Sequence, residues 1–448
     1  MKTLTYINIV ILTTSLLLVN RVEAQENQME LTLAETVDLA LQNNWQVRRS
    51  EEYLGMASGE LKEANQAFLP KVQLSETFAT TNDPLTAFGY KLKQSSISAE
   101  DFDPGYLNDP NRITNYNTRV EVQQPLINVD GIMARKAANV SRQASEENLD
   151  WTRSLTVLQA KRLYFNFQLA SEQLKVVAHS LKTAKASHAV ARDLADQGLI
   201  HQADLMNAEL RVTEIESHLL SVENEIIRAN GDLVYFLNLP SETQVGAIDP
   251  IGVSDVPLDL LSATEIPESR SDLKALSLQL EASDHQLKSS KSSFLPKLNA
   301  FGSYEWNDSS PFGTQANNYL VGGKLQWDIF QGGSRMGKMQ KAAAQRNIAE
   351  LSYQEKIAAG HQQLTQVQNG IRLASKQIDV SEQALAQAEE SYNVRRDRYE
   401  EGLEKTSDLL MAESMLMEKK LNKIRSLNQY QQLVFNLEML LEKEIITQ

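Results

Sequence analysis

Apolar and polar side chains alternate residue by residue in four short stretches of the chain. The alternation runs from Lys71 to Phe78, from Tyr116 to Gln123, from Lys297 to Trp306 and from Tyr319 to Trp327. Successive side chains of a strand point to opposite faces, so each stretch predicts a strand with one apolar and one polar face. Strands of about ten residues with aromatic residues near their ends are typical of outer-membrane barrels, although four strands of a soluble sheet would show the same alternation.

Two windows without proline predict long helices. Leu126–Leu239 and Phe312–Gln448 hold none of the eleven prolines and are rich in Ala, Leu, Gln, Glu and Lys. Proline inside a helix costs about 3 kcal/mol, so its absence favours uninterrupted helices. Ile132–Gln197 also lacks glycine and would form one helix of about 100 Å. Apolar steps of three and four residues in Leu174–Ala191 and Leu385–Tyr399 indicate coiled-coil packing.

The sequence is duplicated. Three motifs recur in the same order, at spacings of 226, 203 and 204 residues. The drop from 226 to 203 gives the first copy 23 extra residues between Pro70 and Val122, so the two copies differ mainly in one loop. The recurring motifs are Phe68-Leu69-Pro70-Lys71 with Phe294-Leu295-Pro296-Lys297, Val122-Gln123-Gln124-Pro125-Leu126-Ile127 with Leu325-Gln326-Trp327-Asp328-Ile329-Phe330, and Gly198-Leu199 with Gly402-Leu403.

The first residues have the pattern of a cleaved secretory signal. Lys2 precedes the apolar stretch Ile7–Val19, and Val22-Glu23-Ala24 offers small residues for cleavage. An N-terminal membrane anchor is the alternative, but this apolar stretch is shorter than the roughly 20 residues that a span needs. We expect residues 1–24 to be a signal peptide. The remaining chain divides into a first repeat at 25–239, an equatorial linker at 240–268 and a second repeat at 269–448.

Four strands are too few to close a barrel within one chain. Single-chain outer-membrane barrels begin at about eight strands, and an open sheet edge in lipid would leave backbone groups without hydrogen bonds. The chain is therefore expected to share a barrel with copies of itself. Two copies would give an interior filled by side chains, whereas three copies would leave room for a passage.

Charge and composition exclude several classes of protein. Lys and Arg number 44 against 58 Asp and Glu, a net charge of −14, which argues against a nucleic-acid-binding protein. The chain has no cysteine, which excludes disulfides, thiolate metal sites, cysteine nucleophiles and a cysteine-linked lipid anchor. No stretch after the signal holds 18 consecutive apolar residues, so we expect no transmembrane helix.

No motif for covalent chemistry or cofactor binding stands out, so we do not expect an enzyme. The six histidines include no pair at the spacing of a helical metal site. Gly332–Met339 resembles a phosphate-binding loop, but Met339 replaces the Ser or Thr that would bind magnesium. No nucleophile elbow or zinc-protease motif is found. We therefore expect no catalytic residues, no cofactor and no metal.

These features together resemble the TolC-like outer membrane efflux protein family, also called outer membrane factors. The resemblance covers residues 30–441. Apart from the two copies of the Phe-Leu-Pro-Lys motif and of the Gly-Leu turn, it is carried by Leu31-Thr32-Leu33-Ala34-Glu35, Ala40-Leu41-Gln42-Asn43-Asn44, Gln124-Pro125-Leu126-Ile127 and Trp327-Asp328-Ile329-Phe330-Gln331-Gly332-Gly333. Thr32 and Glu35 also predict a capping box that starts the first helix.

The resemblance implies a mainly α-helical fold with a β membrane part. Each chain would contribute four strands to a 12-stranded barrel of a homotrimer, and its long antiparallel helices would form a periplasmic tunnel. The implied function is the exit duct of a tripartite efflux pump or a type I secretion system in the Gram-negative outer membrane. The implied partners are outer membrane lipid, a periplasmic adaptor and an inner-membrane transporter of RND, ABC or MFS type.

Two other functions stay open from the sequence. The first is a periplasmic coiled-coil adaptor or spacer without a pore, which would not need four lipid-facing strands. The second is an exported hydrolase, for which the sequence offers only scattered carboxylates. The substrate that a duct would carry, whether a drug, a metal or a protein, is not encoded in any motif that we identify.

The long loop of the first copy, Thr81–Ile113, is rich in turn-forming residues. Asp83-Pro84, Asp103-Pro104-Gly105 and Asp109-Pro110 favour turns. We expect a structured loop outside the membrane, acting either as an outer lid of the pore or as a surface loop without a role in transport.

Several residues are candidate sites at the ends of the long elements. Glycine followed by leucine suits a helix end with a tight reversal, and the resemblance implies that adaptors dock on this tip. The alternative is a plain turn whose leucines pack within their own hairpins. The expected docking residues are Gly198, Leu199, Gly402 and Leu403, and the expected strand starts and helix bends are Pro70, Pro296, Gly131, Gly332 and Gly333.

The resemblance also implies a periplasmic gate near the tip. Tyr399 stands three residues before Gly402, and Asp204 and Asp408 each stand six residues after a tip glycine. A three-fold ring of Asp408 would concentrate negative charge. Alternatively, both aspartates only stabilise the first turn of a helix. Glu404 and Lys405 follow the second turn, where the family sometimes has an arginine.

Overall fold

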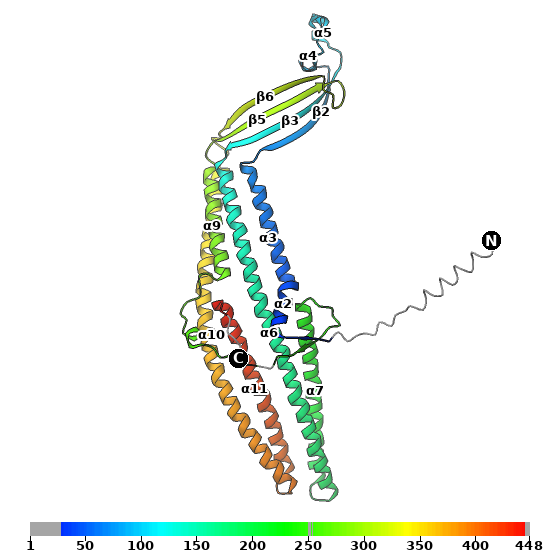
Figure 1. Cartoon of the computed structure of the whole chain (residues 1–448), viewed down its shortest axis with the longest axis vertical. Helices are drawn as coiled ribbons and strands as arrows, with labels where there is room; N and C mark the ends of the chain where they lie inside the picture. The colour runs from blue at the N-terminus through cyan, green and yellow to red at the C-terminus, as the bar shows by residue number, and fades with distance from the viewer. Residues whose placement is uncertain (1–27, 250–251, 253, 444–448) are drawn as a thin grey trace, which may run out of the picture. The chain divides into compact units, whose positions relative to one another are not determined.

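The structure, a computed structural model, describes residues 28–249, 252 and 254–443 (Figure 1). The expected signal peptide lies outside the described residues. The backbone packs as two compact units. We call residues 49–151 and 268–360 the sheet unit, and residues up to 48, 152–267 and 361–448 the hairpin unit. Each unit contains segments of both repeats, so the division into repeats stays a prediction about the sequence.

The sheet unit contains one antiparallel sheet in the order β2-β3-β5-β6. Its strands confirm the four stretches of alternating residues, although β6 ends one residue before Trp327. Pro70 and Pro296 directly precede β2 and β5, where a residue without an N–H group breaks no ladder bond. The bounds are Lys71–Thr81 for β2, Ile113–Ile127 for β3, Lys297–Asp308 for β5 and Ala316–Gln326 for β6.

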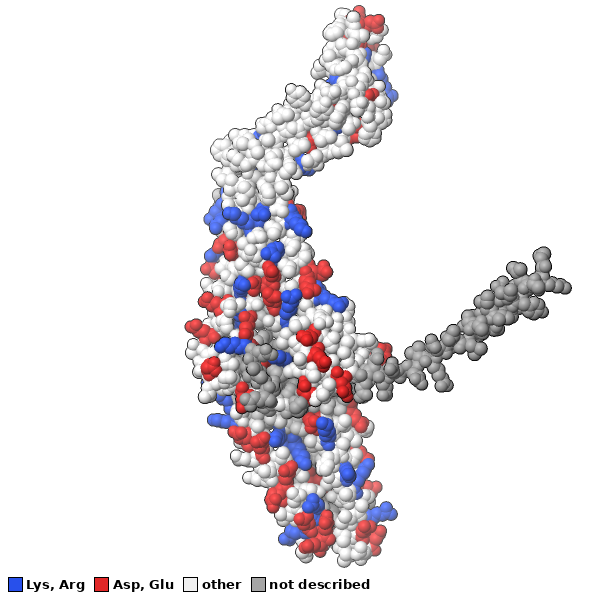
Figure 2. Space-filling view, in the orientation of Figure 1, with Lys and Arg blue, Asp and Glu red and all other residues white. Residues whose placement is uncertain are grey.

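One face of this sheet is apolar and exposed. Phe78 packs on Tyr116 with ring centroids 5.1 Å apart, and Tyr304 packs on Trp306 at 4.7 Å. Figure 2 shows few charged side chains over the strands, whereas the helices carry many of both signs. The exposed apolar side chains of the strands include Val72, Leu74, Phe78, Tyr304, Tyr319, Val321 and Leu325.

Glu76 is a charged residue at a position of β2 where the alternation would place an apolar one. It pairs with Thr118 in the register of β2 and β3, and therefore lies on the apolar face. Its carboxylate accepts hydrogen bonds from the Thr118 hydroxyl and, at 3.2 Å, from the backbone N–H of Phe312. The charge is therefore hydrogen-bonded within the chain, close to the aromatic residues Phe78 and Trp306.

Two very long helices confirm the windows without proline. The first, α6 (Val129–Asp196), and the second, α10 (Ser334–Glu400), each contribute residues to both units. In the sheet unit they are accompanied by α3 (Trp45–Ala64) and α9 (Ser271–Ser292). Among the described residues, no helix combines the length and the apolar character that crossing a bilayer would need.

A buried charged cluster fixes the start of α9. Arg270 is 1 % exposed and forms two hydrogen bonds with Asp272, of 2.6 and 2.9 Å. Its guanidinium lies 5.5 Å from the ring centroid of Trp151 on α6, and Lys356 on α10 forms an ion pair with the same carboxylate at 3.2 Å. A buried charge is tolerated when it is paired in this way, so the cluster joins three helices of the sheet unit.

The hairpin unit contains two helical hairpins, formed by α6 with α7 (Gln202–Phe236) and by α10 with α11 (Thr406–Leu441). The predicted coiled-coil positions Val177, Ala184 and Ala191 are at most 1 % exposed, and the first two pack with residues of α7 and α11 in one core cluster. Small residues in this core let the helices approach closely. Both turns lie at the same end of the unit (Figure 1).

A small two-stranded sheet completes the hairpin unit. Strand β1 (Gln28–Leu31) pairs in parallel with β4 (Gln244–Ala247), and α2 (Leu33–Asn43) follows β1 directly. Thr32 and Glu35 form the predicted capping box, with the Glu35 N–H donating to the Thr32 hydroxyl at 3.2 Å and the Thr32 N–H to the Glu35 carboxylate at 2.9 Å. A short helix, α8 (Leu258–Leu261), lies in the predicted linker.

Candidate functional site

The two turns of the helical hairpins have the same backbone geometry. Gly198 and Gly402 adopt φ angles of +72° and +73°, which glycine reaches without the strain that a Cβ atom would cause. The N–H of Leu199 donates to the carbonyl of Leu194 at 2.9 Å, and the N–H of Gly198 to that of Ala195 at 2.9 Å. This pair of bonds is a Schellman motif.

The second turn repeats these bonds. Leu403 donates to the Arg398 carbonyl at 2.8 Å, and Gly402 to that of Tyr399 at 2.9 Å. Leu199 and Leu403 are 67 % and 63 % exposed, so neither leucine is packed inside its own hairpin. Two apolar side chains are therefore presented at the same end of the hairpin unit.

Tyr399, a predicted gate residue, lies inside its own chain. It is 2 % exposed and packs with Tyr392, Leu409 and Ala412. Its hydroxyl lies 3.2 Å from the Thr406 hydroxyl oxygen. Tyr399 therefore links the end of α10 to the start of α11 across the turn.

Asp204 and Asp408 each lie in the first turn of a helix. The Asp204 carboxylate accepts a hydrogen bond from the His201 N–H at 3.3 Å at the start of α7. Asp408 is the third residue of α11, next to Ser407, whose hydroxyl lies 3.5 Å from its carboxylate. Within the residues described, no hydrogen bond joins Asp204, Asp408 and Tyr399 to one another, so the structure of one chain does not bring the predicted gate together.

Glu404 is a tip residue whose contacts the sequence did not predict. Its carboxylate forms ion pairs of 3.0 Å with Arg395 and of 3.0 Å with Arg398. The positions 204 residues earlier are Ala191, Leu194 and Ile200, so only the second turn has this charged bridge. Two arginines three residues apart, followed by a glutamate beyond the glycine, were the signal that could have revealed it.

Glu413 on α11 is a second residue that sequence reasoning missed. It is 3 % exposed, and its Oε2 lies 3.5 Å from the Ser187 hydroxyl. Its Oε1 is buried and finds no hydrogen-bond partner among the described residues. Burial raises the pKa of this carboxyl to about 7, against the opposing influence of Arg211. Glu209, the matching residue of the first copy, is exposed. One member of a duplicated pair is therefore a titratable group inside the helical core.

The glycines expected at the helix bends differ from one another. Gly332 and Gly333 have φ angles of +57° and +82° immediately before α10, which agrees with a sharp turn. Gly131 instead lies within the first turn of α6 and does not adopt a positive φ. A Cβ atom there would come within 2.4 Å of Asn128 Nδ2 and 3.0 Å of the Ala67 Cβ. The lack of space therefore accounts for a glycine at position 131, and its role in the bend between β3 and α6 stays a prediction.

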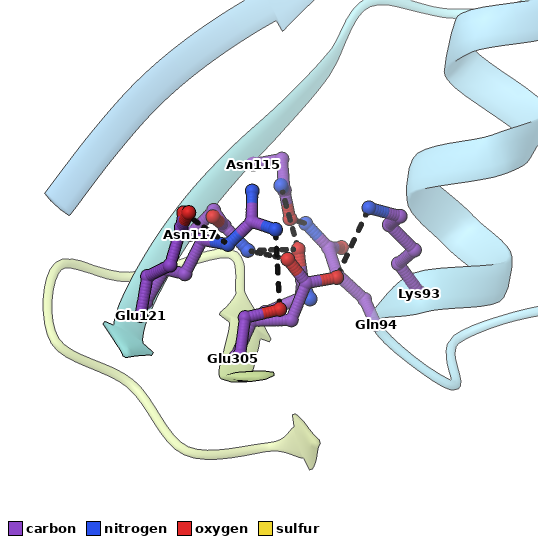
Figure 3. A network of polar contacts seen from close by, with 9 residues as sticks. Lys93, Gln94, Asn115, Asn117, Glu121 and Glu305 are labelled. Atoms are coloured by element: carbon purple, nitrogen blue, oxygen red, sulfur yellow. Dashed lines mark hydrogen bonds and ion pairs between the residues drawn. The ribbon is translucent and has the colours of Figure 1, made fainter. Parts of the chain in front are cut away.

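The polar face of the sheet carries a network of buried amides and charges. Asn115 and Asn307 are 3 % and 0 % exposed, and the Asn115 Nδ2 donates to the Asn307 Oδ1 at 3.0 Å. Asn117 donates to the same Oδ1 at 3.1 Å and to the Glu305 carboxylate at 3.3 Å (Figure 3). This network occupies one end of β3 and β5. Within the described part of the chain, no group of three or more His, Asp or Glu residues is arranged to bind a metal ion.

Comparison with known proteins agrees with the helices and strands described above. The sequence profile of the family described as outer membrane efflux protein matches residues 36–238 and 264–441. The protease secretion protein PrtF of Dickeya chrysanthemi is 23% identical over 404 residues, which are 85% of this chain and 81% of PrtF. The probable outer membrane lipoprotein SilC of Salmonella typhimurium is 23% identical over 282 residues, or 61% of this chain and 60% of SilC.

Among solved structures, the outer membrane protein VceC of Vibrio cholerae has a similar fold. Its TM-score is 0.78 at 16% sequence identity, and the match covers 92% of this chain and 97% of VceC. The predicted fold of one chain, mainly α-helical with four β-strands, is therefore confirmed. Because the family profile matches most of the chain in two stretches, the chain belongs to the outer membrane efflux protein family.

Proposed function

We propose that the chain is one subunit of a trimeric duct that conducts molecules from the periplasm across the outer membrane to the exterior. The observation that carries this proposal is a four-stranded sheet with an exposed apolar face and two edges that no strand of the described residues covers. An apolar face suits contact with lipid, and the opposite polar face suits a water-filled passage. The exported coiled-coil adaptor considered above would have no use for such a sheet.

The edges of the sheet favour assembly with further copies. In the order β2-β3-β5-β6, the outer edges of β2 and β6 have no strand partner among the described residues. Each unsatisfied backbone group costs several kcal/mol in lipid. Pairing β2 of one copy with β6 of the next would satisfy both edges, and three copies would close twelve strands around a lumen.

The helices offer a second argument for assembly. Five large apolar side chains of α7 are at least 56 % exposed, and they fall within one face at 100° per residue. Another copy would cover this stripe, because a soluble surface rarely keeps so long an apolar row. The residues are Met206, Leu210, Leu220, Ile227 and Tyr235.

The duct itself is passive in this proposal. An inner-membrane transporter would supply the energy, and a periplasmic adaptor would connect it to the exposed tip. PrtF is named for the secretion of proteases and CusC of Escherichia coli for cation efflux, and the two have similar identity to this chain. The names of these relatives therefore assign no particular cargo to this chain.

Cell fractionation and native mass measurement in detergent test this proposal. We expect the mature chain in the outer membrane fraction with the mass of three chains. A monomer in the soluble periplasmic fraction would contradict the duct and favour the adaptor. A reconstituted trimer should also conduct ions across a planar bilayer, which an adaptor would not do.

We also propose that Tyr399, Asp204 and Asp408 help to hold the periplasmic end closed. The expected result of combining Tyr399→Phe with Asp204→Ala is a severalfold rise in single-channel conductance with trimer stability little changed. Tyr392→Phe, a second buried tyrosine of α10, is the matched control and should leave conductance unchanged. Wild-type conductance with a lowered melting temperature would instead assign these residues to capping and packing.

A further inference from the structure

The long loop of the first copy is a folded element. It contains α4 (Pro84–Lys93) and α5 (Pro104–Asn108), joined by a short 3₁₀ turn. Asp83 caps α4 by accepting the Thr86 N–H at 2.8 Å. The rings of Phe88 and Phe102 pack edge to face with centroids 5.7 Å apart. The loop therefore has its own caps and apolar contacts, as expected for a structured loop.

This loop is attached to the polar face of the sheet by the end of α4. Gln94 is 3 % exposed, and its Nε2 donates to the Thr114 carbonyl at 2.8 Å and to the Asn115 Oδ1 at 2.9 Å. Lys93 Nζ lies 3.1 Å from the Glu305 carboxylate. Figure 3 shows Lys93 and Gln94 pointing from α4 toward the side chains of β3 and β5.

The attachment is specific because the groups that receive it are buried. Asn115 accepts a hydrogen bond from Gln94 and donates one to Asn307, which also accepts one from Asn117. A buried amide that loses its hydrogen-bond partner destabilises the fold, so the network favours one position of the α4 end. The Lys93–Glu305 pair is more exposed and adds less.

The path of α4 carries it across the sheet. The helix follows β2, at one edge, yet it contacts β3 and also β6, at the opposite edge. The second copy has no counterpart, because only residues 309–315 connect β5 with β6. The first copy thus places a helix over the end of the polar face, whereas the connection in the second copy, residues 309–315, contains no helix.

We propose that α4 is a fixed size filter at the outer mouth of the duct, held on the lumen side by Gln94 and Lys93. This inference rests on the proposed function, because the polar face lines a lumen only in a closed barrel. Three copies would place three α4 helices around one opening. Small solutes would pass between them, whereas wide molecules would be excluded until the helices are displaced.

The absence of cysteine from the sequence allows a direct test with a single introduced thiol. Gln123 lies on the polar face, eight residues along β3 from Asn115, or about 27 Å. Gln123→Cys would be labelled in intact cells with a small methanethiosulfonate and with a wide polyethylene-glycol maleimide. Gln315→Cys, on the exposed short loop, reports the rate for a thiol outside the duct.

In the Lys93→Ala/Gln94→Ala variant, the wide reagent should label Gln123→Cys about tenfold faster, with the rate of the small reagent unchanged. Lys91→Ala is the matched control, since Lys91 pairs with Asp101 inside the loop and has no hydrogen bond or ion pair with a strand among the described residues. An unchanged rate for the wide reagent in the double variant would overturn the filter.

A second comparison does not depend on the folding of the double variant. In chains with no further substitution, we compare the labelling rate of Gln315→Cys with that of Gln123→Cys. The ratio of these two rates should be at least about tenfold higher for the wide reagent than for the small one. An equal ratio of labelling rates for both reagents would also overturn the filter. A thiol at position 123 that the small reagent cannot reach from outside would contradict the proposed duct itself, so the two failures are distinguishable.

Discussion

Replacing both Leu199 and Leu403 by aspartate should abolish transport while leaving trimers in the outer membrane. Both leucines are more than 60 % exposed, and the two turns are held by backbone hydrogen bonds that do not involve the leucine side chains. The substitution should therefore cost little stability. Three copies would present six leucines, and charges at these positions would oppose the docking of an apolar adaptor surface.

The measurement is an export or resistance assay in cells that lack other ducts, together with the trimer content of the outer membrane. Leu258→Asp is the matched control, because Leu258 is an equally large and 83 % exposed residue of the same unit away from the turns. Unchanged transport in the double variant would remove the docking role. Loss of the trimer would show that the leucines act in assembly.

The elements that were predicted correctly depend on local rules. The capping box of Thr32 and Glu35, the turns at Gly198 and Gly402, and the long helices follow from residue type and short spacing. Each rule involves residues a few positions apart, so the sequence displays it directly. The alternating strands belong to this class as well, since the period of two is itself a local property.

The contacts that were missed join residues far apart in the sequence. Gln94 meets Asp308 across 214 positions, and Glu413 meets Ser187 across 226. Their burial is decided by which elements pack together, and no short pattern records that. The duplication of the sequence does not reveal burial either, because Glu413 is buried while its counterpart Glu209 is exposed.

Gly131 and Gly332 stand at similar places in the sequence for different physical reasons. The sequence places Gly131 near the start of a long helix, as it places Gly332, and the duplication suggests the same role for both. The structure gives Gly332 a left-handed backbone and gives Gly131 a close contact with Asn128. A glycine can be required by backbone conformation or by lack of space, and residue type alone does not separate these causes.

Glu413→Gln should stabilise the protein at pH 8 and have little effect at pH 5. Burial raises the folded-state pKa of Glu413 from 4.5 to about 7. Between these values the folded chain keeps a proton that the unfolded chain releases. The contribution of Glu413 to stability is therefore most favourable below about pH 4.5, and it is lost as the pH rises through 7. Since each pKa unit corresponds to about 1.4 kcal/mol, the full change is about 3 kcal/mol for each chain.

The groups that face Glu413 explain why the charge is poorly compensated. Ser187 on α6 offers one weak hydrogen bond, and Tyr392 on α10 offers none. Arg211 on α7 lowers the pKa of Glu413 but does not overcome the effect of burial. The Nε and Nη2 atoms of Arg211 are also buried, with no hydrogen-bond partner in the described part of the chain. A neutral glutamine keeps the shape of the side chain and removes the cost of a buried negative charge.

Melting temperatures of the detergent-solubilised protein at pH 5 and pH 8 would measure this effect. The wild type should lose stability between the two values, and Glu413→Gln should lose much less, so that the variant melts at a higher temperature at pH 8. The matched control is Glu209→Gln at the duplicated position, where an exposed carboxylate gives no reason for a change. If Glu413→Gln kept the pH dependence of the wild type, another group would be the source of the instability, and Glu413 would already be charged and satisfied in the folded chain.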